Sequence, residues 1–128
     1  MDRRIAVRGQ SLVEFALTLS LLVLILLGML DLGRAYNAYV IITNAARNGA
    51  YFGSYHPTDS SGIKQRVVLE AQDSGVTLTT SNVTIATTGV SLTPIAVTVN
   101  YNFDLMTAFL PGLEVLTLHS TAKMMILR

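Results

Sequence analysis

The chain has 128 residues, of which 51% are hydrophobic and 13% are charged, and its formal net charge is +1. This composition excludes a disordered chain and an ordinary soluble domain with a charge-rich surface, and the length allows one domain at most. The basic residues form no patch, so we expect no nucleic-acid partner. The chain contains no cysteine, which excludes a disulfide framework, a thiolate nucleophile and a cysteine-rich zinc site.

Residues 12–30 form an apolar run of membrane-spanning length. Thirteen of them are Leu, Val, Ile or Phe, and Glu14 is the only charged residue among them. Insertion of these side chains contributes about −4 to −8 kcal/mol, which exceeds the cost of about 3 kcal/mol for a carboxylate at the bilayer centre. A membrane span is therefore favoured over a buried core helix, which the short remainder of the chain could not surround.

The charges on the two sides of this run differ. Three arginines and one aspartate precede it, whereas Asp31 and Arg34 balance each other just beyond it. The positive-inside rule then places the N-terminus in the cytoplasm and the rest of the chain outside. Asp31 and Arg34 lie three positions apart at the outer membrane edge, where they can pair along the helix or bridge between subunits, and the spacing favours the local pair.

The helix is predicted to continue past the membrane, over residues 10–53 in all, with a span at 12–30 and an amphipathic upper half at 31–53. Such a helix would be about 66 Å long. Gly53 and the pair His56–Pro57 are predicted to end it. Residues 31–53 contain no proline and repeat apolar or small side chains every three or four positions. These side chains are Leu32, Ala35, Tyr39, Ile42, Ala46 and Ala50.

Four glycines of this helix have alternative interpretations. Gly28 and Gly33 can allow close packing of neighbouring helices or local unwinding, and close packing is favoured. Gly49 and Gly53 form a GxxxG pair, which we interpret as a helix terminus and not as a dimer contact, because it lies beyond the membrane.

Residues 54–128 are predicted to form a small head. The spacing predicts a short helix over 63–73, and runs of threonine and β-branched residues predict strands at 76–80, 83–87, 95–103 and 115–126. The last two strands alternate apolar and polar side chains, as in an antiparallel sheet with one core face. Residues 104–112 are predicted to form a short apolar turn or helix that joins the last two strands. The predicted fold class is α+β: a long N-terminal membrane-spanning helix continues into a head with one short helix and a three- to four-stranded antiparallel sheet.

The segment RGQSLVEF at residues 8–15 carries a further pattern. It resembles the type IV prepilin processing site, where a membrane peptidase cuts after a glycine on the cytoplasmic side. The resemblance implies that residues 1–9 are a basic leader, that the bond between Gly9 and Gln10 is cut, and that Glu14 and Phe15 take part in subunit assembly. Glu14 would pair with the free α-amino group of an adjacent subunit or of its own chain. The alternative is a carboxylate in the first helical turn that faces headgroup water and is favoured by the helix dipole.

Three segments, RGQSLVEFAL (8–17), LGMLDLGRAY (27–36) and TNAARNGAYFG (43–53), together resemble the TadE-like family of pilin-related proteins of tight-adherence, Flp-type systems. This resemblance implies a minor pilin or pseudopilin that is cut by a prepilin peptidase and assembled through its helix with other pilin or pseudopilin subunits and a pilus assembly platform. It implies a single-pass protein of the bacterial inner membrane with a periplasmic or extracellular head. The alternative is an uncleaved, membrane-anchored scaffold or partner-binding protein of a secretion system.

We expect no enzymatic activity. Ser61 and Lys64 match an S-x-x-K pattern, but the partner motifs of that class of enzyme are missing. His56 and His119 are the only histidines, and no spacing typical of metal ligands exists. We therefore assign no catalytic, cofactor-binding or metal-binding residue.

Overall fold

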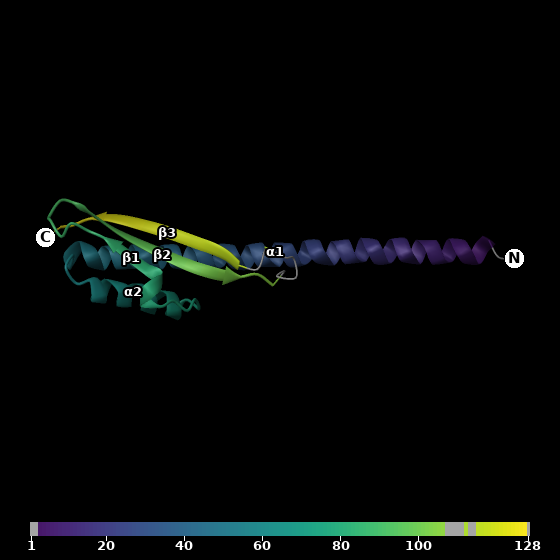
Figure 1. Ribbon diagram of the computed structural model, residues 1–128, viewed down its shortest axis with the longest axis horizontal. Helices are drawn as coiled ribbons and strands as arrows, with labels where there is room; N and C mark the ends of the chain where they lie inside the picture. The colour runs from purple at the N-terminus through teal and green to yellow at the C-terminus, as the bar shows by residue number, and fades with distance from the viewer. Residues whose placement is uncertain (1–2, 107–111, 113–114, 128) are drawn as a thin grey trace.

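The computed structural model describes residues 3–106, 112 and 115–127, and the side chains from residue 9 onward. It contains a long helix α1 (Arg3–Tyr55), a short helix α2 (Ser60–Asp73), a 3₁₀ turn η1 (Thr80–Asn82) and the strands β1 (Val83–Ala86), β2 (Pro94–Asp104) and β3 (Val115–Met125). Figure 1 shows α1 as a rod that projects from a small head at its C-terminal end. The predicted α+β fold is confirmed, with three strands in the sheet.

Helix α1 is one uninterrupted element of 53 residues, about 80 Å long at 1.5 Å per residue. It begins at Arg3, so residues assigned above to the leader are helical too, because three arginines and an alanine, which are good helix formers, lie among them. The helix ends at Tyr55, directly before His56 and Pro57, because a proline disfavours helical backbone angles at the residue before it.

The sheet is antiparallel with the order β1-β2-β3. Val99 of β2 pairs with Val83 of β1 and with Ser120 of β3, which fixes the register. Along β2, Ile95, Val97, Val99 and Phe103 are buried, and the residues between them are more exposed. One face of the sheet therefore packs on the helices, and the opposite face is polar, with a hydrogen bond of 2.8 Å between the hydroxyls of Thr98 and Thr121.

The core contains a stripe of mostly small side chains on α1. Its alanines and Ile42 contact α2 and the apolar face of the sheet. Leu32 and Tyr39, which the apolar repeat placed on the same stripe, are exposed instead, because the sheet lies against the narrower line of small residues, where the backbones can approach closely. The buried apolar residues of α1 are Ala35, Ala38, Ile42, Ala45, Ala46 and Ala50.

Gly49 and Gly53 belong to this close contact, and their interpretation as a helix terminus was wrong. A Cβ atom at Gly53 would lie 2.6 Å from Cδ1 of Ile95 and 3.1 Å from Cδ1 of Ile63, and one at Gly49 would collide with the side chain of Val67. The GxxxG pair thus allows α1 to approach α2 and β2 within the same chain.

Helix α2 is capped by Asp59, whose carboxylate accepts hydrogen bonds from the backbone N–H of Gly62 at 2.9 Å and from the hydroxyl of Ser61 at 3.0 Å. The bond from Gly62, followed by that from Ser61, lowers the pKa of Asp59 below its ordinary value. Ser61 of the S-x-x-K pattern is therefore part of a helix cap. The opposite end of α2 closes at Gly75, which has a positive φ of 92°.

The strand predicted at residues 76–80 was wrong. Val76 and Leu78 are buried, but Val76 donates its N–H to the carbonyl of Ala71 and makes no strand pair. The side chain of Asn82 then accepts the N–H of Thr79 at 2.9 Å, which turns the chain into η1. Local side-chain bonds of this kind compete with strand pairing. Most of the turn or helix predicted at 104–112 lies outside the described residues.

Candidate functional site

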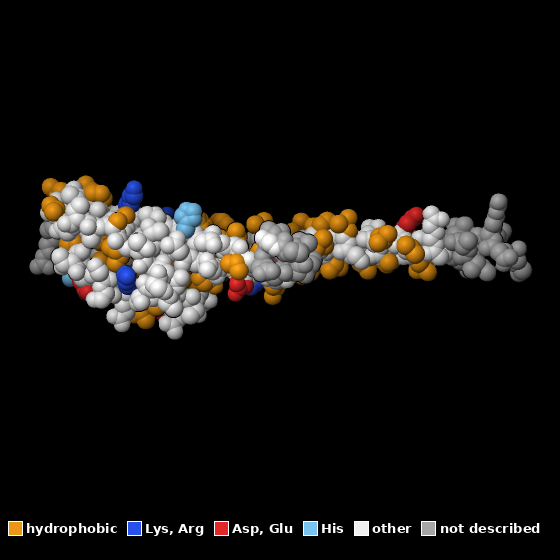
Figure 2. All heavy atoms as spheres, in the orientation of Figure 1, with side chains coloured by type: hydrophobic (Ala, Val, Ile, Leu, Met, Phe, Trp, Pro, Cys, Tyr) orange, Lys and Arg blue, Asp and Glu red, His pale blue; other side chains and the backbone are white. Residues whose placement is uncertain are grey.

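The N-terminal part of α1, residues 10–30, is a bare apolar rod. Its large side chains are exposed except for the half-buried Leu27, and none of its most apolar window is buried in the head. Figure 2 shows hydrophobic side chains along this segment on the visible face. The helix is long and apolar enough to cross a membrane.

Hydroxyl groups within the rod are satisfied by the helix itself. Thr18 donates to the carbonyl oxygen of Glu14 and Ser20 to that of Ala16, each at 2.8 Å. Such bonds keep a polar side chain compatible with lipid or with a neighbouring apolar helix, since neither offers water as a partner.

The residues predicted for processing and assembly lie together at the start of the rod. Gly9 and Gln10 are consecutive residues of α1, and the side-chain amide of Gln10 donates to Glu14 Oε1 at 3.4 Å, one helical turn away. Glu14 and Phe15 are exposed. A Cβ atom at Gly9 would meet nothing within 4 Å, so packing within the chain gives no reason for a glycine at this position.

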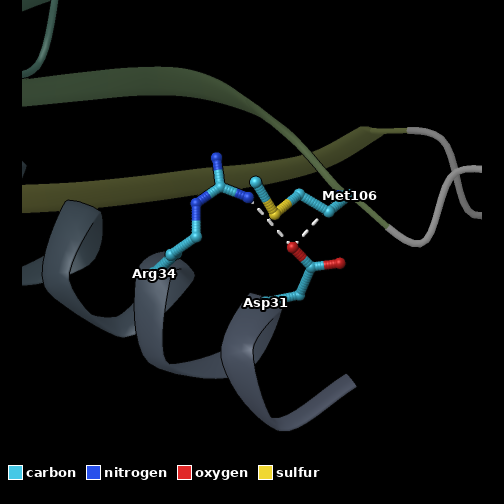
Figure 3. A network of polar contacts seen from close by, with 3 residues as sticks. All are labelled: Asp31, Arg34 and Met106. Carbon is cyan, nitrogen blue, oxygen red and sulfur yellow. Dashed lines mark hydrogen bonds and ion pairs between the residues drawn. The ribbon is translucent and has the colours of Figure 1, made fainter. Parts of the chain in front are cut away.

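Asp31 marks the neck, where the rod enters the head, and it is only 2% exposed. Its Oδ1 accepts two hydrogen bonds, from the guanidinium of Arg34 at 3.0 Å and from the backbone N–H of Met106 at 2.9 Å (Figure 3). The guanidinium carbon of Arg34 lies 5.0 Å from the centre of the Phe103 ring, in the range of a cation–π contact. The ion pair between Asp31 and Arg34 is therefore local, and the same carboxylate ties the end of β2 to α1.

Sequence reasoning identified Asp31 and Arg34 but missed Met106. The bond to Met106 uses a backbone N–H and joins residues 75 positions apart, so no side-chain pattern indicates it. Asp31 itself could have indicated a further hydrogen-bond donor, since a carboxylate in an otherwise apolar or small-residue stripe needs such donors when it is buried.

The described residues contain no group of three or more His, Asp or Glu that could hold a metal ion. His56 stacks on Phe52 with ring centres 4.7 Å apart, and His119 lies on the exposed polar face of β3. These histidines belong to different surfaces of the head.

The fold and the bare rod define a class of protein: a small α+β head carried on one long N-terminal helix that can serve as a membrane anchor. The family model described as TadE-like protein matches residues 9–50, which are part of α1. The resemblance in the sequence is thus confirmed over this segment. No curated protein and no solved structure matches the chain.

Proposed function

We propose that the chain is a structural subunit, a minor pilin or pseudopilin, of a tight-adherence pilus or secretion apparatus. The observation that carries this proposal is the division of α1 into two parts: one half is bare and apolar, and the other half is the spine of the head. A simple anchor needs only the first part. A helix that is rigidly joined to a head suits a subunit that leaves the membrane as one piece and packs its rod against other rods.

On this proposal a prepilin peptidase cuts between Gly9 and Gln10 at the cytoplasmic surface of the inner membrane. Proteases bind their substrates in extended form, and a glycine lowers the stability of the helix by about 1 kcal/mol relative to alanine, which eases local unwinding. The open space around Gly9 supports a role outside the fold of the chain.

Glu14 would then pair with the new α-amino group at Gln10 of an adjacent subunit or of its own chain. Glu14 already faces Gln10 across one helical turn. When rods surround this carboxylate, it loses water and needs a cationic partner, because an unpaired buried charge is strongly unfavourable. The assembly platform and the other subunits supply the remaining contacts, and the chain itself performs no catalysis.

The second candidate is an uncleaved, membrane-anchored scaffold of the same secretion system. One observation favours it: α1 runs without interruption through Gly9 to Arg3, as expected for a leader that stays on the helix. This scaffold would bind partners through its head and would not enter a fibre.

The N-terminal residue of the native protein distinguishes the two candidates. We expect a mature N-terminus at Gln10 in protein from membranes and from sheared surface material. A chain that keeps residues 1–9 in both fractions contradicts the pilin proposal and supports the anchored scaffold.

Glu14→Gln tests the assembly step separately, because it keeps the size of the side chain and removes its charge. We expect the amount of protein in the sheared fraction to fall by about tenfold or more, as loss of one partner of a buried ion pair implies. Thr18→Ala is the matched control one turn further along the rod, where the hydroxyl bonds only to its own helix. Equal amounts of both variants in the fibre would contradict the role of Glu14.

A further inference from the structure

The head exposes one aromatic side of α1. Tyr36, Val40, Arg47 and Tyr51, which we call the tyrosine face, follow one another at spacings of four and seven positions and thus lie on one side of the helix. Tyr36 is 69% exposed and Tyr51 56% exposed. A shallow groove of about 200 Å³ lies on this side, between Tyr36 and Arg47. Gly33 lies three positions before Tyr36 and seven before Val40, hence on the same side of the helix, and it too has open space around it.

The membrane explains only the lower end of this face. At 1.5 Å per residue, Tyr36 lies about 9 Å beyond Leu30, the last residue of the apolar run, and Tyr51 lies about 31 Å beyond it. The headgroup region on each side of the hydrocarbon core is only about 5–8 Å thick. The backbone of Tyr36 lies just outside this region, and its side chain, which leans toward the N-terminus of the helix, can reach it, whereas Arg47 and Tyr51 are beyond the reach of the bilayer.

The composition of the face is typical of a protein interface. Tyrosine and arginine are among the residue types most enriched at the centres of such interfaces. Arg47 forms no ion pair with any residue in the part of the chain that the structure describes. The face thus presents tyrosine rings beside one cation.

A complementary surface lies on α2 of the same chain. Leu69 is 48% exposed, Asp73 is exposed one turn further along, and Glu70 accepts a hydrogen bond of 2.6 Å from the side-chain amide of Asn48. Since Asn48 follows Arg47 directly on α1, this bond places the C-terminal half of α2 level with Arg47 along the rod axis. A second copy that lies parallel to the first, with little axial shift, brings its Glu70 and Asp73 level with Arg47.

We propose that the tyrosine face of one copy docks against Leu69, Glu70 and Asp73 on α2 of the next copy. The two surfaces differ, so the contact is heterologous, and each copy keeps one free surface of each kind for further copies. Parallel docking of the heads also brings the rods side by side, with Gly33 on the side where the neighbour approaches. This inference rests on the proposed function as a fibre subunit.

Disulfide crosslinking tests the contact, because the chain contains no cysteine. In the double variant Tyr51→Cys and Leu69→Cys, oxidation of intact cells should give a ladder of dimers and higher oligomers. The matched control, Thr121→Cys with Leu69→Cys, replaces the position on the tyrosine face with one on the open face of the sheet and should give no ladder. The absence of a ladder from the first variant, or equal ladders from both, would overturn the proposal.

Charge reversal gives a second, independent measurement. We expect Arg47→Glu and Asp73→Arg each to reduce the amount of the protein in the sheared fraction severalfold, and their combination to restore at least half of it. A combined variant as deficient as either single one contradicts the pairing. If the unaltered chain keeps residues 1–9 and never enters the sheared fraction, the proposed function itself fails. If it enters the fibre and only the crosslink and the rescue fail, the docking surface alone is wrong.

Discussion

The two halves of α1 place their apolar side chains in opposite environments. In the rod, large side chains such as Leu24 are exposed, and Gly28 has open space around it, as does Gly33 just beyond the neck. In the head, the buried stripe consists mostly of alanine, and Gly49 and Gly53 have no room for a Cβ atom. The most hydrophobic half of the helix is thus the less buried one. Large aliphatic residues on α1 are free to contact lipid or other chains, whereas its small residues pack against the sheet of the same chain.

Ile42→Ala should give the largest difference between the two halves. Ile42 is fully buried, and removal of such a side chain from a core typically lowers the free energy of unfolding by about 2–5 kcal/mol. Leu24→Ala, in the rod, should leave the stability of the head unchanged. Urea unfolding of the full chain in detergent micelles, followed by tyrosine fluorescence, measures both. Equal effects would mean that the rod and the head unfold as one unit.

Gly49→Ala and Gly33→Ala make the same change at a packed and at an open position of α1. The new methyl group at position 49 collides with Val67, so we expect the head to lose about 1–3 kcal/mol of stability, as overpacked cores do. At position 33 the methyl group meets nothing, and removal of a glycine from the helix should be neutral or stabilising by up to about 1 kcal/mol. Thermal unfolding in micelles measures the two signs, and a loss of stability at position 33 would contradict the open surface there.

Asp31→Asn tests the neck between the two halves. The amide can still accept from Met106, but it weakens the bond to Arg34, so we expect a loss of about 1–2 kcal/mol, reduced because Arg34 is half exposed. The amide hydrogen of Met106 should exchange faster with solvent. Asp104→Asn, on an exposed carboxylate at the end of β2, is the control and should change neither quantity.

The smallest expected effect concerns the cap of the short helix α2. Because the folded pKa of Asp59 is lowered, this cap stabilises the head above the ordinary pKa of 3.8, and the stabilisation is lost as the pH falls through the folded value. The Tm of the head should therefore fall in acid, and Asp59→Asn should reduce the part of this fall that is due to the cap. An unchanged pH profile would mean that the cap contributes nothing measurable.

The sequence predicted those features that depend on local patterns. The unbroken apolar run predicted α1, and the alternation along β2 and β3 predicted an antiparallel sheet with one core face. It did not predict which side of α1 the sheet covers, because hydrophobicity favoured Leu32 and Tyr39, whereas close approach of backbones favoured the alanines. It also missed the bond from Met106 to Asp31, which depends on where a distant backbone N–H comes to lie.

The direction of the strands gives the head a mechanical property. In Figure 1, β2 and β3 run along α1, nearly parallel to the axis of the rod. A pull on the N-terminal end of the rod therefore loads the contact between α1 and the sheet in shear, so that the stripe of alanines resists as a whole. If the strands ran perpendicular to α1, the same pull would load the contacts one after another, and a far smaller force would separate the sheet from the helix.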